Sequence, residues 1–251
     1  MSAPTPDDHA LARQLATDCG KLLHDFRNEW FARGNNAWAL RDEGDMRGHH
    51  FLVDALKIAR PDDGVISEEG YAEPSRLIKS RVWIVDPLDG TNEYGERGRP
   101  DWAIHVALTI DGDPACGAVA LPVFGATYCT GEPTVVPPVG DRRLRVVSSR
   151  SRTTYAAMLV SEALDADIAY LGSAGAKAMA VVRGEVDVYA HSGGMYEWDS
   201  CAPAAVARAA GLHVSRIDGS PLVYNQRDTW MPDFLVCRPE LADRVLAALW
   251  D

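Results

Sequence analysis

Residues 84–91 read Ile-Val-Asp-Pro-Leu-Asp-Gly-Thr, and this stretch indicates how the chain folds. The apolar run from Val82 to Val85 predicts a buried strand, which we expect Pro87 to end. Gly90 allows a sharp turn, so that Thr91 begins a short helix whose free N–H groups can hold a phosphate. The plainer interpretation is a turn, because Asp-Pro and Asp-Gly are common turn dipeptides.

A second short apolar run also ends in acidic residues. Val65-Ile66 precedes Ser67 and the pair Glu68-Glu69, a pair that by itself is more often part of a solvated loop. Sequential strands are neighbours in a sheet about two-thirds of the time, so Glu68 can lie beside Asp86 and Asp89. Carboxylate oxygens favour magnesium or manganese over zinc or copper, and no cluster of His or Cys competes with that choice.

Two more acidic residues stand where helices are expected to begin. Asp199 precedes an alanine-rich helix, and Asp45 opens a helix predicted over 45–59. Each can serve as an N-cap residue, which is the structural interpretation. The functional interpretation is a site of four carboxylates whose charge two divalent cations would balance. Its members are Glu68, Asp86, Asp89 and Asp199.

The chain of 251 residues is expected to form one compact unit with two halves, 1–135 and 136–251. In the first half, a long helix over 11–30 and an antiparallel meander of strands over 102–130 predict an α+β arrangement. A stretch rich in proline and glycine, 131–143, connects the halves. Beyond it, strands and helices alternate in the α/β manner.

Composition excludes several classes of function. The formal net charge of -11 opposes binding to nucleic acid or to an anionic membrane. The five cysteines include no C-x-x-C pair, so we expect reduced, buried thiols. The longest apolar run, 116–124, is far shorter than the ~18 residues of a membrane span, and the N-terminus does not resemble a signal peptide. We expect a cytoplasmic protein without a nucleic-acid or membrane partner.

Three motifs in a fixed order are similar to a known superfamily. Glu68-Glu69, Asp-Pro-Leu-Asp-Gly-Thr at 86–91 and Trp198-Asp199 resemble the magnesium-dependent, lithium-sensitive phosphatases, which include inositol monophosphatase and fructose-1,6-bisphosphatase. The resemblance covers nearly the whole chain, including residues 172–181 and 219–225. Within the superfamily the chain is most similar to the CysQ-type 3'(2'),5'-bisphosphate nucleotidases of actinobacteria, which hydrolyse 3'-phosphoadenosine 5'-phosphate (PAP).

The resemblance implies a layered α-β-α-β-α sandwich with two or three Mg²⁺ ions, or Mn²⁺ in their place, where the halves meet. Superfamily members often form homodimers. The implied metal ligands are Glu68, Asp86, the carbonyl of Leu88, Asp89 and Asp199. Asp45 and Thr91, with Glu68, match the residues that deprotonate the attacking water. The backbone N–H groups of Gly90, Thr91 and Asn92 would hold the scissile phosphate.

The expected substrate is a small phosphate ester, and several residues bear on which one. Ser173 and Lys177 match a Ser and a Lys that contact the second phosphate in PAP phosphatases, although Lys177 stands one residue further along and can also be a solvated helix residue. Arg152 replaces a His that contacts the nucleotide, or belongs to a charged rim, and His191 replaces an Arg. Glu197 could accept hydrogen bonds from sugar or cyclitol hydroxyls.

The sequence therefore predicts a Mg-dependent phosphomonoesterase whose first candidate substrate is PAP, a role that would relieve product inhibition in sulfate activation. Inositol-1-phosphate and fructose-1,6-bisphosphate are the alternative substrates, and a non-catalytic regulatory protein that binds a phosphorylated ligand is the alternative class. A haloacid-dehalogenase-type phosphatase needs two Asp residues two positions apart. Asp86 and Asp89 are three apart, which argues against that mechanism.

Overall fold

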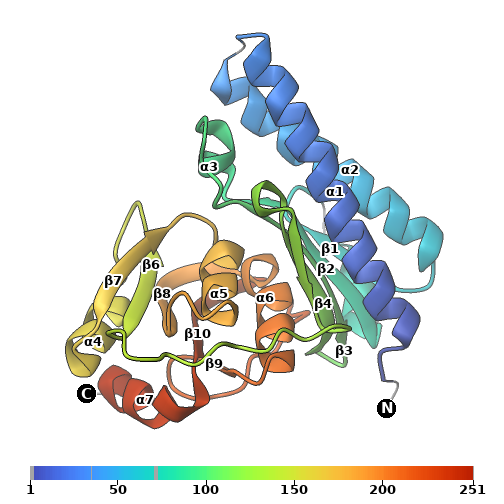
Figure 1. Cartoon of the computed structure of the whole chain (residues 1–251). Helices are drawn as coiled ribbons and strands as arrows, with labels where there is room; N and C mark the ends of the chain where they lie inside the picture. Colours follow the sequence, from blue (N-terminus) through green and yellow to red (C-terminus); the bar gives the residue numbers. More distant parts are fainter. Residues whose placement is uncertain (1–2, 35, 71–72, 251) are drawn as a thin grey trace.

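Two five-stranded sheets carry the fold, and helices cover both faces of each sheet (Figure 1). The computed structural model describes residues 3–34, 36–70 and 73–250. The helices form an outer layer on the first sheet, a layer between the sheets and an outer layer on the second sheet. In that order they are α1 (Pro6–Ala32) and α2 (Ala37–Ala59), α5 (Ala174–Val182) and α6 (Glu197–Ala209), and α4 (Tyr155–Leu164) and α7 (Ala242–Trp250). The expected α-β-α-β-α sandwich is confirmed.

The first sheet brings the two acidic strand ends together. Its strands, in spatial order, are β1 (Gly64–Ser67), β2 (Arg81–Asp89), β3 (Ala103–Ile110), β4 (Asp113–Leu121) and β5 (Ala126–Cys129). Strands β1 and β2 are parallel, with Ser67 paired to Val85, and the other neighbours are antiparallel. Because parallel strands end at the same edge, the residues that follow β1 lie beside the end of β2.

The end of β2 differs from the prediction, because Pro87 does not end the strand. The strand continues to Asp89 through an irregularity, in which Asp86 pairs with His105 and Asp89 pairs with Ala103. Such a bulge leaves residues out of the hydrogen-bond ladder, so a proline is tolerated there. Gly90 follows with φ 88° and precedes the short helix α3 (Thr91–Gly95), as predicted.

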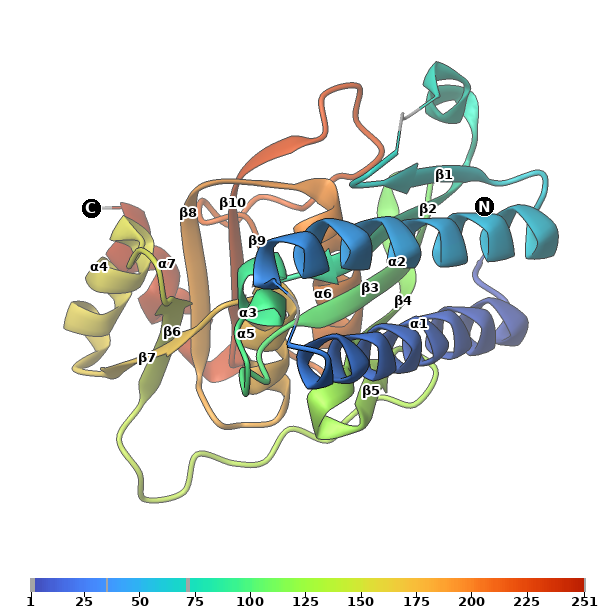
Figure 2. The same ribbon diagram turned by 90° about the horizontal axis from the view of Figure 1, so that it is seen from above.

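The second sheet is mixed. Its strands, in spatial order, are β7 (Asp167–Leu171), β6 (Arg145–Ser149), β8 (Val188–Tyr196), β10 (Trp230–Cys237) and β9 (His213–Ser215). The segment that connects the two sheets has no regular structure over 133–139 and runs along the outside of the molecule (Figure 2). Three short 3₁₀ helices complete the fold: η1 (Pro74–Ile78), η2 (Pro122–Phe124) and η3 (Pro239–Leu241).

Two predicted helix starts are wrong. Helix α2 begins at Ala37, where the Asn36 side chain accepts a hydrogen bond from the Trp38 N–H, so Asp45 lies inside the helix. Helix α6 begins at Glu197, and Asp199 occupies its third position. The Asp199 carboxylate accepts the Tyr196 N–H over 2.6 Å, as acidic residues at that position often do. Neither Asp45 nor Asp199 is an N-cap residue.

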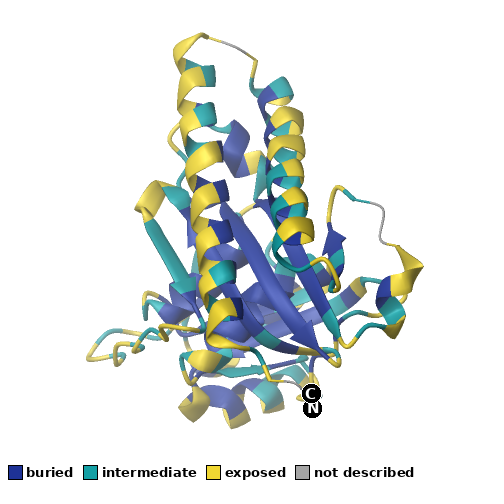
Figure 3. Ribbon diagram, turned by 90° about the vertical axis from the view of Figure 1, so that its right-hand side faces the viewer, coloured by how far each residue is buried: buried dark blue, intermediate teal, exposed yellow. Residues whose placement is uncertain are grey.

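Apolar side chains fill both sides of the first sheet, whose central strands β2, β3 and β4 are almost entirely buried, while the outer faces of α1 and α2 are exposed (Figure 3). The layer between the sheets is rich in alanine. Gly117 of β4 lets α6 approach closely, because a Cβ atom there would stand 3.2 Å from that of Ala205. All five cysteines lie among the described residues and are buried and free. Within the described part of the chain, no helix combines the length and apolar character needed to span a bilayer.

Candidate active site

Three aspartates from distant parts of the chain meet between the sheets. Asp86 and Asp89 come from the end of β2, and Asp199 comes from the first turn of α6. One carboxylate oxygen of each lies within 4.8 Å of the others. Asp86 and Asp89 are buried and Asp199 is half-buried. The predicted convergence of these three acids is therefore present in the fold.

Two of these three aspartates have no arginine or lysine partner among the described residues. Within the described chain, neither Asp86 nor Asp199 forms an ion pair with an arginine or lysine. Burial, and then repulsion from Glu68 and Asp89, raise the pKa of Asp86 well above its usual range. Burial and repulsion from Asp89 raise the pKa of Asp199 to about 6. The Nδ1 atom of His105 lies 4.0 Å from an Asp86 oxygen, but no arginine or lysine pairs with Asp86 or Asp199 among the described residues, and closely spaced hard oxygen donors of this kind fit a divalent cation such as Mg²⁺.

Glu68, the fourth predicted carboxylate, is exposed just after β1 and is not among the three acids whose oxygens converge, but it shares their electrostatic environment. Desolvation of its carboxyl group and repulsion from Asp199 raise the pKa of Glu68 to about 7. The charges of Glu69 and Asp89 add to this shift. A carboxyl group that is destabilised in this way gains most from a bound cation.

Asp89 differs from the other acids because protein groups hold it. The Ser173 hydroxyl donates a hydrogen bond to it, as do the N–H groups of Gly175 at 2.6 Å and Ala174 at 3.2 Å. Burial opposes ionisation, but His105 and the charge of Lys177 lower the pKa of Asp89 to about 2. The predicted contact of Ser173 with a substrate phosphate is not favoured, since its hydroxyl faces Asp89 and caps α5.

Asp45 and Thr91 form the pair that the sequence predicts. The Thr91 hydroxyl lies 3.4 Å from an Asp45 carboxylate oxygen and 3.1 Å from the carbonyl oxygen of Leu88. Burial, followed by repulsion from Glu69 and Glu68, raises the pKa of Asp45 to about 8. Asp45 therefore adds another acidic group, from α2, next to the carboxylates already described.

Two glycines explain how α2 comes close enough to β2 and α3 to place Asp45. A Cβ atom on Gly44 would stand 2.7 Å from the Tyr94 ring, and one on Gly48 would stand 2.9 Å from the Pro87 side chain. Real Cβ atoms do not approach so closely, so larger residues would push α2 away.

The other predicted substrate residues are placed in different ways. Lys177 is 3% exposed, donates a hydrogen bond to the Gly172 carbonyl and lies 5.3 Å from the centroid of the Tyr189 ring. The alternative of a solvated lysine is therefore wrong. His191 contacts the Gly194 carbonyl through Nε2 at 3.0 Å. Arg152 is exposed beside the backbone of Gly193.

Glu197 is not available to a substrate in this structure. Its side chain is 1% exposed, and its two oxygens accept the N–H groups of Asn225 at 2.8 Å and Gln226 at 2.7 Å. Both oxygens are therefore used to hold the 225–226 loop. The burial of Glu197 therefore argues against the predicted contact with a sugar hydroxyl. Of the residues predicted to hold the phosphate, Gly90 precedes α3 and Asn92 is exposed.

Sequence reasoning missed His105, which lies at the centre of the site. Its ring is fully buried, with Nε2 3.2 Å from an Asp89 oxygen and Nδ1 3.0 Å from the Trp198 carbonyl oxygen. Nδ1 must donate, because a carbonyl only accepts. A Cβ atom on Gly175 would overlap the ring, so this glycine makes room for it. The missed signal is a histidine within the largely apolar stretch 103–110.

A stacked aromatic pair next to Asp199 was also missed. The Tyr196 and Trp198 rings lie 4.8 Å apart with an interplanar angle of 10°. Tyr196 is 46% exposed, and Trp230, which pairs with it across β8 and β10, is 51% exposed. Because the Tyr196 N–H is bonded to Asp199, the pair is fixed close to the carboxylates.

Comparison with known proteins gives a consistent assignment. The model of the inositol monophosphatase family matches residues 40–251. The chain is 45% identical to a 3'-phosphoadenosine 5'-phosphate phosphatase of Mycobacterium bovis over 93% of this chain and 90% of the relative. It is 31% identical to the 3'(2'),5'-bisphosphate nucleotidase CysQ of Escherichia coli, over 76% and 82%.

Solved structures agree on the fold. Inositol monophosphatase II of Staphylococcus aureus superimposes with a TM-score of 0.80 at 19% identity, over 96% of this chain and 95% of that one. CysQ of Bacteroides thetaiotaomicron superimposes with a TM-score of 0.78 at 24% identity, over 92% and 97%. The chain belongs to the inositol monophosphatase family, a family of phosphomonoesterases.

Proposed function

We propose that this protein removes the 3'-phosphate of PAP, giving AMP and phosphate, in a reaction that depends on Mg²⁺. The observation that carries the chemistry is the convergence of Asp86, Asp89 and Asp199 without an arginine or lysine on Asp86 or Asp199 in the described chain. The substrate is supported by 45% identity to PAP phosphatases over 93% of the chain.

The proposed metal ligands are Glu68, Asp86, the Leu88 carbonyl, Asp89 and Asp199, for two or three Mg²⁺ ions. Bound magnesium would supply positive charge that acidifies water and neutralises a phosphate ester. The Thr91 hydroxyl can donate its single hydrogen to the Leu88 carbonyl or to Asp45. When Asp45 is ionised, Thr91 could take a proton from an attacking water while its own proton passes to the Asp45 carboxylate. The first N–H groups of α3, at Gly90 to Asn92, would hold the phosphate.

The aromatic pair supports a nucleotide over a cyclitol. The exposed ring of Tyr196 is held parallel to Trp198 beside Asp199, and such a surface suits a planar base. Stacking of a base on an aromatic side chain contributes about 1–3 kcal/mol. Exposed Arg152 beside Gly193 offers a cation for the second phosphate. Glu197, which favoured inositol or fructose phosphates, is buried and holds the backbone N–H groups of Asn225 and Gln226.

The test is phosphate release from PAP, inositol-1-phosphate and fructose-1,6-bisphosphate, each with and without Mg²⁺ and with Li⁺ added. We expect PAP to have the highest kcat/KM, and activity to require Mg²⁺ and to fall with Li⁺. Tyr196→Ala should raise KM for PAP about tenfold, and Tyr170→Ala, an equally exposed tyrosine on β7, should leave it unchanged. A higher kcat/KM on inositol-1-phosphate would reject the substrate, and no release from any ester would favour a binding protein.

Three sequence-based expectations stay predictions. They are the cytoplasmic location, the homodimer, and the division into functional halves at residue 135.

A further inference from the structure

Arg150 joins the two halves of the chain through ion pairs that the catalytic chemistry does not use. It follows β6, while its partners Glu93 and Glu96 belong to α3 and the residue after it. One terminal nitrogen lies 2.8 Å from a Glu93 oxygen and 2.6 Å from a Glu96 oxygen. The other terminal nitrogen lies 3.1 Å from the second Glu96 oxygen. One guanidinium therefore holds two carboxylates of the other half.

Arg150 and Glu93 also contact residues 171–172, which lie just before α5. The Arg150 N–H donates to the Leu171 carbonyl at 3.1 Å. Glu93 is 7% exposed, and its carboxyl group lies so close to Gly172 that a Cβ atom there would overlap it. Gly172 is thus the residue that lets Glu93 reach Arg150. Backbone and side chain of Arg150 together fix α3 against 171–172.

Asp101 fixes this segment from the other side. Its carboxylate accepts the Gly172 N–H at 2.7 Å, and its carbonyl accepts the Ser173 N–H at 3.2 Å. The next contacts lead into the active site, because Ser173 donates to Asp89 and Lys177 donates to the Gly172 carbonyl. The position of α3 is therefore tied to the residues that orient Asp89.

We infer that Arg150 is a positioning residue, which sets the phosphate cradle at the start of α3 relative to Asp89 and the start of α5. Helix α3 has five residues and is too short to be stable without tertiary contacts. Arg27 of α1 holds the backbone carbonyls of this segment, but it does not reach the second half of the chain. Removing Arg150 would therefore leave Glu93 buried without a charged partner and break the side-chain link between α3 and 171–172. The inference rests on the proposed role of Gly90 to Asn92 in holding the phosphate.

The test compares Arg150→Ala with Arg143→Ala. Arg143 also pairs with two carboxylates, Asp165 and Asp167, but all three lie in the second half. For whichever ester the wild-type protein hydrolyses best, we expect Arg150→Ala to lower kcat/KM at least about tenfold, because small misplacements of catalytic groups are costly. Arg143→Ala should leave it within about twofold of wild type. Arg150→Lys should recover part of the loss.

A second measurement separates this inference from the proposed function. Amide hydrogen exchange over residues 90–96 should become faster in Arg150→Ala and stay unchanged in Arg143→Ala, whether or not any ester is hydrolysed. If the protein hydrolyses no ester, the proposed function is rejected, but hydrogen exchange over 90–96 still tests the inference about Arg150. Unchanged exchange over 90–96 would overturn the inference. A lower Tm with wild-type kcat/KM would also overturn it, since the role would then be structural only.

Discussion

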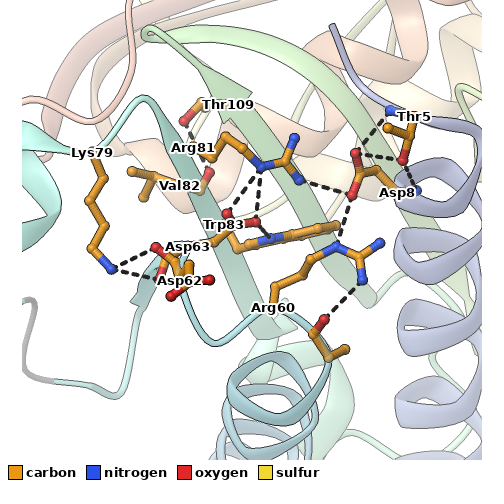
Figure 4. A network of polar contacts seen from close by, with 11 residues as sticks. Thr5, Asp8, Arg60, Asp62, Asp63, Lys79, Arg81, Val82, Trp83 and Thr109 are labelled. Carbon is orange, nitrogen blue, oxygen red and sulfur yellow. Dashed lines mark hydrogen bonds and ion pairs between the residues drawn. The ribbon is translucent and has the colours of Figure 1, made fainter. Parts of the chain in front are cut away.

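Strand β2 begins among arginines and ends among acids. At its start, Arg81 shares the buried Asp8 carboxylate with Arg60, at 2.9 and 3.0 Å, and also binds Asp63 (Figure 4). At its end, Asp86 and Asp89 meet Asp199. At the start of the strand, arginines neutralise the carboxylates of Asp8 and Asp63. At its end, only Asp89 is neutralised by groups of the protein.

The difference appears in the pKa values. Burial opposes ionisation of Asp8, but hydrogen bonds from Thr5, Arg81 and Arg60 lower its pKa to about 2. Burial and acidic neighbours instead raise the pKa of Asp199 to about 6 and that of Asp45 to about 8. Asp8 is therefore stable as an anion through contacts within the protein. The acids at the other end of β2, Asp89 excepted, need a bound cation to become stable as anions.

The largest expected effect comes from removing one acid of the cluster. Asp86→Asn should lower kcat at least about 1000-fold, because a metal ligand is lost. In EDTA the variant should have a higher Tm than the wild type, since repulsion within the cluster is reduced while the oxygen that accepts the Leu88 N–H is kept. Activity assays and thermal unfolding check both outcomes. Wild-type activity, or a lower Tm in EDTA, would show that Asp86 is not an unneutralised ligand.

An intermediate effect is expected at the start of the strand. Asp8→Ala should lower the free energy of unfolding by about 3 kcal/mol, because two partly buried arginines lose their shared partner. Urea unfolding measures this change, and kcat should match the wild type. Loss of kcat in a folded Asp8→Ala protein would contradict the separation between the two ends of β2.

The smallest effect is the dependence of stability on pH without metal. Between about pH 4 and pH 8, Asp199, Glu68 and Asp45 bind more protons in the folded state than in the unfolded state, because their folded pKa values are raised to about 6, 7 and 8. The free energy of unfolding therefore falls as pH rises through this range. In EDTA, Tm should therefore be lower at pH 8 than at pH 5.5.

Two controls sharpen this result. Asp45→Asn should reduce the drop in Tm, while excess Mg²⁺ should raise Tm more at pH 8 than at pH 5.5, because the ion needs ionised ligands. Asp8 does not contribute to the slope, since the stability from its lowered pKa is complete above about pH 4 and is lost only at lower pH. A Tm in EDTA that rises toward pH 8 would show that the acids are neutralised within the protein.

Local pattern predicted which strands end in acids, but neither the exact end of β2 nor the contacts made there. The order of apolar runs and acids placed Glu68, Asp86 and Asp89 at neighbouring strand ends, because adjacent strands in the sequence usually pair. Ser173 was assigned to the substrate from the resemblance to PAP phosphatases, and Glu197 from its position next to Trp198. Their partners, Asp89 and the 225–226 backbone, are distant in sequence, so no local pattern could indicate that these side chains were already used.

By itself, the sequence determined the residue types of the site and the elements that carry them, since periodicity and turn chemistry act over a few positions. Only the tertiary structure decided which acids are neutralised. The arginines of Asp8 lie 52 and 73 positions away, and the groups that hold Asp89 lie 84 to 86 positions beyond it. Charge compensation depends on distance in space, and it is the packing of α1 on the first sheet and of α5 and α6 between the sheets that sets those distances.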